Sequence, residues 1–321
     1  MRALGAALLV ALLASSLARA LPDPNGRGRF PVGVTTLTFT KTSVTTGQPR
    51  PLATVIWYPA VPGSGTATAL GQRDAEALRH RFPLVVFSHG SCGIPTQSTF
   101  LTIALASFGF VVAAPPHPGN QFTDGFPACF GNSGDSLANR PADVSFVIDS
   151  MLAENARRDS RFFRRLNPRR IGMSGHSLGG LTTLLVAARE PRVRAALALA
   201  PVGSADIRIP TMLQGADADT FAPFESNDVP EYARLAGPRF LLEILHTGHF
   251  AWADVCAAPI FGTTDCGPGT NTIGQDEAHG LVLRFAVPFV ERYVAGDRRW
   301  GRLLKPAGAA PGVVLQAEPR R

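Results

Sequence analysis

Hydrophobic and polar positions along the chain follow two patterns, and the change between them predicts the architecture. Residues 32–40 alternate apolar side chains with threonines, a period of two that favours a strand with one buried face. Residues 52–58 form a second such strand, and 61–71 a loop. Residues 84–87 are instead a continuous apolar run, which is typical of a strand covered on both faces, and 109–114 repeat that pattern.

From residue 96 onwards, helical spacing of apolar residues alternates with short strands. We expect helices at 96–108, 140–155, 178–188 and 276–294, and strands at 170–173, 195–199, 211–214 and 240–245. Because strands that alternate with helices form βαβ units, the pattern predicts the α/β class, with a mostly parallel central sheet and helices on both faces.

The two ends of the chain differ from this pattern. Arg2, the apolar run 4–13 and the small residues of Ala18-Arg19-Ala20 predict a signal peptide over residues 1–20. An uncleaved anchor is the alternative, although the run is shorter than the roughly 20 residues that a spanning helix needs. We expect one catalytic domain at 21–304 and a flexible tail at 305–321, where Ala, Pro and Gly predominate.

Composition narrows the class of protein. With 45% hydrophobic and 17% charged residues, the chain is not intrinsically disordered. Its net charge of +7 is scattered, and no aromatic platform or nucleic-acid motif accompanies the basic residues, so no nucleic-acid partner is expected. No later apolar run is long enough to span a bilayer, so stable membrane insertion is not expected either. The sequence does not determine the oligomeric state, for which we expect a monomer.

Four cysteines, Cys92, Cys129, Cys256 and Cys266, lie in the part of the chain predicted to be exported. An even number in an oxidising compartment favours two disulfides. Sequence proximity favours Cys92–Cys129 and Cys256–Cys266, one of three connectivities, with free thiols as the alternative. None has metal-ligand spacing, so no metal site is predicted.

The strongest chemical signal is Gly175-His176-Ser177-Leu178-Gly179, which fits G-x-S-x-G between a predicted strand and a predicted helix. In such a turn the serine hydroxyl projects above the carboxyl edge of the sheet, at a helix N-terminus that favours negative charge. Ser177 is therefore the predicted nucleophile.

A serine nucleophile needs a base, and the base needs an orienting acid that precedes it in the chain. Asp217 and Asp219 follow one predicted strand, and we choose Asp219, with Asp217 shaping the turn. His246 and His249 follow the next strand, and we choose His249, because it lies on a glycine-bearing loop beyond the strand's end.

Acyl transfer also needs two N–H donors for the oxyanion. One is the main-chain N–H of Leu178, which follows the nucleophile. The other is expected in the turn after the buried strand, Ser88-His89-Gly90-Ser91, and Ser91 is the candidate. The alternative is that this turn is only a tight strand exit.

Taken together, these residues resemble the α/β-hydrolase superfamily, and within it the exported esterases that are like platelet-activating-factor acetylhydrolases and dienelactone hydrolases. The resemblance rests on Phe30-Pro31-Val32-Gly33-Val34, Ile56-Trp57-Tyr58-Pro59-Ala60, Phe87-Ser88-His89-Gly90 and Gly175-His176-Ser177-Leu178-Gly179-Gly180. The acid loop 215–223 is similar to that of bacterial cutinases and polyester hydrolases, whose second Asp is catalytic. The resemblance thus implies a Ser177–Asp219–His249 triad and oxyanion donors at Ser91 and Leu178.

Three features bear on substrate. Dienelactone hydrolases carry a cysteine nucleophile, which argues against that activity here. The segment 116–120 and the loop 118–139 lack a clear aromatic clamp for polyesters, and His117 either lines the acyl pocket or packs the loop. Only residues 202–208 separate two predicted strands, which is too few for a helical lid.

The sequence therefore predicts a secreted or periplasmic serine hydrolase that cleaves short-acyl carboxylic esters, phospholipid-type acetyl esters among them, through an acyl-enzyme and without a cofactor. A cutinase-like hydrolase of polymeric (PET-type) esters is the alternative, and the same triad also serves peptidases and thioesterases. A non-catalytic binding protein of this fold is the alternative from another class.

Overall fold

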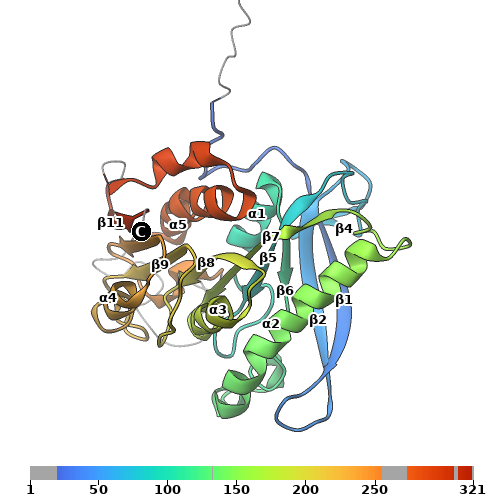
Figure 1. Ribbon diagram of the computed structural model, residues 1–321, viewed down its shortest axis with the longest axis horizontal. Helices are drawn as coiled ribbons and strands as arrows, with labels where there is room; N and C mark the ends of the chain where they lie inside the picture. The colour runs from blue at the N-terminus through green and yellow to red at the C-terminus, as the bar shows by residue number, and fades with distance from the viewer. Residues whose placement is uncertain (1–19, 132, 255–272, 307–309, 320–321) are drawn as a thin grey trace, which may run out of the picture.

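The computed structural model describes residues 20–131, 133–254, 273–306 and 310–319, and its strands form one sheet (Figure 1). In sheet order these are β11 (Val313–Glu318), β10 (Arg239–Ile244), β9 (Thr211–Ala216), β8 (Val193–Leu199), β7 (Leu166–His176), β5 (Phe82–Ser88), β6 (Val111–Ala114), β2 (Pro49–Pro59), β1 (Val32–Thr42), β4 (Gly71–Arg73) and β3 (Thr66–Thr68). The strands from β6 to β10 are parallel, whereas β2, β1 and β11 add antiparallel pairs at the two sides. The predicted α/β class with a mostly parallel sheet is confirmed.

Helices cover both faces of this sheet (Figure 1). One layer holds α1 (Thr99–Phe108) and α5 (Gln275–Val290), and the other holds α2 (Ser133–Ala156), α3 (Leu178–Arg189) and α4 (Phe224–Arg234). Short helical turns are η1 (Phe122–Asp124), η2 (Ala128–Phe130), η3 (His249–Trp252), η4 (Glu291–Ala295) and η5 (Arg298–Leu303). The alternation of side chains in β5 explains the two layers: Val85 and Phe87 pack with α1 and α5, whereas Leu84 and Val86 pack with α2.

Three segments differ from the expectation. The predicted loop 61–71 contains β3, and β4 pairs in parallel with β1. Helix α4 was not predicted, because its polar sequence and Pro230 hide the helical period. The prediction of a flexible tail at 305–321 is wrong for residues 313–318, because β11 pairs in register with β10, with Val313 opposite Ile244.

The short connection from β8 to β9, residues 200–210, contains no helix, so the prediction of no large lid insert is confirmed. Two other predictions fall outside the described residues: the signal peptide over residues 1–20, of which only Ala20 is described, and the Cys256–Cys266 pair. In the described part of the chain, no helix combines the length and the apolar character that crossing a membrane requires.

Candidate active site

Ser177 lies at the sharp turn between β7 and α3. Its backbone angles, φ 56° and ψ −119°, fall in a region that a residue with a side chain rarely adopts, and its N–H bonds to the Leu199 carbonyl at 2.8 Å. Gly179 makes the turn possible, since a Cβ there would meet the Ser88 carbonyl oxygen at 1.9 Å. Ser177 is therefore the residue immediately before α3, and this half-buried residue lies at the carboxyl edge of the sheet.

The predicted acid and base meet at the same edge. His249 Nδ1 donates to Asp219 Oδ2 at 2.7 Å, and each residue is only 4% exposed. Asp219 Oδ1 accepts two further bonds, from the main-chain N–H groups of Phe221 and Ala222. Burial raises the pKa of Asp219, but these hydrogen bonds and His249 outweigh it, and the net pKa is lowered. The carboxylate thus fixes Nδ1 as the protonated nitrogen and leaves Nε2 free to accept a proton.

A chain of side chains ties the His249 loop to the nucleophile turn. His176, next to Ser177, donates from Nε2 to the His249 carbonyl at 2.8 Å, and Gln97 Nε2 donates to His176 Nδ1 at 3.0 Å. Burial lowers the pKa of His176 to about 3, helped by the nearby His249, so the ring is neutral. The rings of His176 and His249 lie 4.7 Å apart. His176 thus connects the loop of His249 to the turn of Ser177. Within the described residues the Ser177 hydroxyl makes no hydrogen bond, and catalytic contacts of this kind often tighten only when substrate binds.

The predicted oxyanion donors lie on either side of this turn. A Cβ on Gly90 would lie 3.4 Å from Ser177 Cβ, so the loop after β5 approaches the nucleophile directly. Ser91 follows Gly90 and is half-buried, and Leu178 is the first residue of α3. Neither main-chain N–H is used by a hydrogen bond within the described residues, as an oxyanion site requires.

A disulfide joins the loop after β5 to the loop after β6. Cys92 and Cys129 are bonded, with 5.3 Å between their Cα atoms, which confirms this predicted pair. Gly93 and Gln121 form a parallel bridge beside it. The bond therefore anchors the segment that carries Ser91.

Asp217 and His246, the residues not chosen as acid and base, lie outside the hydrogen-bonded pair. Asp217 is exposed, and its carboxylate accepts a bond from Thr247 N–H at 3.3 Å, so it shapes the turn between the acid and base loops. His246 is exposed at the end of β10, with a positive φ of 59°. In the described structure, neither side chain makes a hydrogen bond or an ion pair with His249 or Asp219.

A second serine–histidine–carboxylate arrangement lies beneath the site. Ser88 Oγ is 2.8 Å from His117 Nε2, and His117 Nδ1 is 3.1 Å from Asp143 Oδ2. All three residues are fully buried, so no substrate reaches the Ser88 hydroxyl. Burial, with the charges of Arg140 and Arg50, holds the pKa of His117 well below its usual range. The open question about His117 is thus answered: it packs beneath the loop and does not line an acyl pocket.

Sequence reasoning missed several residues that hold the site. Gln97 and His176 connect the nucleophile turn to the His249 loop. Asp254 accepts hydrogen bonds from the main-chain N–H groups of Thr99 and Phe100, which attaches the segment after His249 to the start of α1. Arg140 was expected on an amphipathic helix, yet it is fully buried. No local pattern marks these residues, because their partners are distant in the chain: Gln97 and His176 lie 79 positions apart, Asp254 and Thr99 155, and Arg140 and Asn120 20.

The chain is similar to known proteins in sequence and in fold. The sequence model of the PETase family, described as PET hydrolase-like, matches residues 82–314. The chain belongs to this family. It is 30% identical over 245 residues to cutinase est1 of Thermobifida alba, and the matched region covers 74% of this chain and 69% of that protein. It is 24% identical over 257 residues to the bis(hydroxyethyl) terephthalate hydrolase of Streptomyces coelicolor, covering 78% and 65%.

Among solved structures, a ferulic acid esterase from Streptomyces cinnamoneus shares the fold of this PET hydrolase-like protein. Its TM-score is 0.68, with 24% identity over 90% of this chain and 97% of that one. The predicted α/β-hydrolase esterase with cutinase-like character is confirmed, and so is the prediction of a serine hydrolase acting on carboxylic esters. Among the described residues, no group of three or more His, Cys, Asp or Glu side chains could hold a metal ion.

Proposed function

We propose that this protein hydrolyses short-acyl carboxylic esters with Ser177 as nucleophile, His249 as base and Asp219 as the orienting acid. The observation that carries the proposal is the buried 2.7 Å bond between His249 Nδ1 and Asp219 Oδ2, beside the strained turn that presents Ser177. An orienting carboxylate, a histidine with Nε2 available and a serine at a helix N-terminus make up the machinery of acyl transfer.

The reaction proceeds through an acyl-enzyme. Ser177 Oγ attacks the ester carbonyl while His249 Nε2 takes its proton, and the main-chain N–H groups of Ser91 and Leu178 stabilise the oxyanion. His249 then protonates the leaving alcohol as the C–O bond breaks. A water molecule, deprotonated by His249, attacks the acyl carbon and releases the acid, and Ser177 regains its proton. The described residues supply every proton transfer, so the reaction needs no cofactor.

The preference for short acyl chains is supported by the connection from β8 to β9. Residues 200–210 contain no helix that could form a lid over Ser177, so nothing there encloses a long chain. A panel of nitrophenyl esters from acetyl to palmitoyl tests this, with a phospholipid-type acetyl ester added. We expect the highest kcat/KM from acetyl to about hexanoyl and no rate jump above the critical micelle concentration. A preference for palmitoyl with interfacial activation contradicts it.

Hydrolysis of polyesters is a second candidate that one observation favours. Phe221 is 50% exposed, and its ring centroid lies 5.2 Å from that of His249, where an aromatic ester could stack. The named activities of the cutinase and terephthalate-ester relatives agree with it. We expect Phe221→Ala to slow product release from a polyester film more than it slows nitrophenyl acetate hydrolysis. Val314→Ala, an exposed apolar side chain on β11, is the control. Equal losses on both substrates contradict a role in polymer binding.

Export from the cytoplasm, to the medium or the periplasm, is supported by the signal-peptide pattern and by the Cys92–Cys129 disulfide, which is favoured in oxidising compartments. N-terminal sequencing of the protein recovered outside the cytoplasm tests this. We expect the chain to begin at Leu21, and recovery of the uncleaved chain from the cytosol contradicts it.

A further inference from the structure

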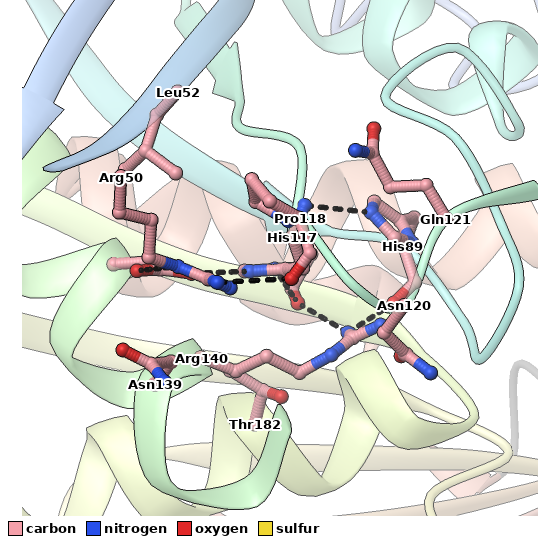
Figure 2. Close-up of polar contacts among 12 residues, drawn as sticks. Arg50, Leu52, His89, His117, Pro118, Asn120, Gln121, Asn139, Arg140 and Thr182 are labelled. Carbon is pink, nitrogen blue, oxygen red and sulfur yellow. Dashed lines mark hydrogen bonds and ion pairs between the residues drawn. The ribbon is translucent and has the colours of Figure 1, made fainter. Parts of the chain in front are cut away.

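A buried cation, Arg140, lies beside Asn120 and the loop that follows β5 (Figure 2). Arg140, in α2, is fully buried, and its guanidinium donates from Nη1 to the His89 carbonyl at 2.6 Å and from Nη2 to the Gly90 carbonyl at 3.1 Å. It also donates to the side chains of Ser88 and Asn120. Figure 2 shows the side chain extending from the helix to reach Asn120 and the loop.

The bond to Gly90 bears directly on the proposed oxyanion donor. The Gly90 carbonyl and the Ser91 N–H belong to one planar trans peptide, so they point in opposite directions. A donor that fixes the carbonyl from behind thereby fixes the direction of the N–H in front. His89 Nδ1 donates to the same carbonyl at 2.8 Å, and in the preceding peptide Gly90 N–H donates to Gln97 Oε1 at 2.9 Å. The carbonyl of the peptide that presents the Ser91 N–H is thus held by three donors, Arg140, His89 and the main-chain N–H of Gly93.

The charge of Arg140 has no direct counter-ion. Every acceptor of its guanidinium is a neutral oxygen, and in the described part of the chain no carboxylate lies within ion-pair distance of it. Asp143, a buried carboxylate of the same cluster, is engaged by the bidentate Arg50 and by His117. Burial lowers the pKa of Arg140 to about 9, which still leaves it charged at neutral pH.

A buried charge without an ion-pair partner is costly for folding, and the charge of Asp143, which raises the pKa of Arg140, offsets only part of the effect of burial. Here the cation is one peptide unit away from the place where the oxyanion develops. A charged donor on a carbonyl polarises the peptide, which strengthens its N–H as a donor. The surrounding polar groups hold the guanidinium in place: Asn120 accepts from it and donates to Ser91 Oγ at 3.2 Å, and Ser88 links it to His117.

We propose that Arg140 is a positioning residue for ester hydrolysis, which aims and polarises the Ser91 N–H by holding the Gly90 carbonyl from behind. This rests on the proposed function, because it assigns the Ser91 N–H to the oxyanion. Arg140 itself touches no substrate, and it acts through the peptide between Gly90 and Ser91.

The test compares Arg140→Lys with Arg50→Lys. A lysine keeps the charge but lacks the planar fork that reaches both carbonyls. Arg50 is also buried in this cluster, yet it bonds to Asp143 and to the Pro118 carbonyl and makes no contact with the oxyanion loop. Each variant is assayed with an aryl ester and with its thiono analogue, in which sulfur replaces the carbonyl oxygen. Sulfur accepts hydrogen bonds weakly, so N–H donors contribute little to hydrolysis of the thiono ester.

We expect Arg140→Lys to lower kcat on the oxygen ester by roughly 10- to 100-fold, less than the loss of a whole oxyanion donor, with KM within about twofold. The ratio of oxygen-ester to thiono-ester kcat/KM should fall with it. Arg50→Lys should leave that ratio unchanged, even if it lowers the melting temperature as much. An unchanged ratio in Arg140→Lys, or an equal fall in both variants, overturns the proposal.

Two further measurements keep the result decisive. If Arg140→Lys does not fold, Asn120→Ala, which releases the guanidinium on one side, should lower the same ratio by a smaller factor; an unchanged ratio there overturns the proposal as well. Ser177→Ala is run in parallel. Retained esterase activity in Ser177→Ala refutes the proposed function itself, whereas an inactive Ser177→Ala beside an unaltered ratio in Arg140→Lys refutes only the positioning role.

Discussion

Replacing Asp219 by asparagine should disable the base without removing it. Asp219 Oδ1 accepts the N–H groups of Phe221 and Ala222 at 2.8 and 2.7 Å, and Oδ2 accepts His249 Nδ1–H. In Asp219→Asn the amide oxygen has to occupy the Oδ1 position, because an NH₂ group there would face two N–H donors. The NH₂ group then faces His249 Nδ1, which must lose its proton to accept from it.

The consequence is a change of tautomer. With Nδ1 as acceptor, the proton of neutral His249 moves to Nε2, which can no longer take a proton from Ser177. A tautomer of this kind lowers kcat of a serine hydrolase by about 10⁴-fold, so we expect a loss of about 10³- to 10⁴-fold in nitrophenyl acetate hydrolysis. Asp217→Asn is the matched control, since Asp217 is exposed and an amide oxygen can still accept from Thr247 N–H. It should retain at least about half of the activity.

The assay is steady-state kinetics of both variants at pH 7 to 8, with circular dichroism to show that each is folded. The pKa of Asp219 is lowered in the folded protein, so its carboxylate stabilises the fold above the unfolded carboxyl pKa of about 3.9, and that contribution is lost as the pH falls. The stability gap between wild type and Asp219→Asn should therefore shrink on acidification. Comparable activity losses in the two variants would refute the choice of acid and the tautomer argument with it.

Two further predictions concern stability. The Cys92–Cys129 bond spans 37 positions, so removing it by Cys92→Ser with Cys129→Ser should lower the free energy of unfolding by about 4 kcal/mol, measured by urea denaturation; no change would show that the bond does not constrain the unfolded chain. Asp228 is fully buried in α4, and its carboxyl oxygens have no side-chain hydrogen-bond partner among the residues that the structure describes; burial, with Asp219 nearby, holds its pKa well above the usual range. A raised carboxyl pKa costs stability as the pH rises above about 3.9. Asp228→Asn should therefore raise the melting temperature at pH 7 and leave it unchanged near pH 3, and a lower melting temperature at pH 7 would contradict this.

The sequence predicted those parts of the fold in which local pattern and burial agree. Continuous apolar runs such as 84–87 are strands covered on both faces, and the turn at Ser177 follows from its glycines. Strand β11 was missed because Ala, Pro and Gly around it suggest mobility, whereas its order comes from pairing with β10. That pairing is a long-range contact, which local composition does not encode.

The candidate site, like the fold, was predicted from the sequence only in part. Ser177, Asp219 and His249 follow from chain order and from their places after successive strands, and the structure brings them to one edge. The supporting residues do not follow from sequence. Arg140 occupies a helix that has polar residues on its outer side, so the pattern alone cannot distinguish a solvated arginine from a buried one.

The central claim is that Ser177 is the nucleophile. Its most direct test is labelling of the folded protein with a fluorophosphonate probe, followed by peptide mass spectrometry. We expect one covalent adduct, on the peptide that contains Ser177, and no labelling or ester hydrolysis in Ser177→Ala. An adduct on another serine, or a Ser177→Ala variant that keeps more than a few per cent of the activity, would contradict the account.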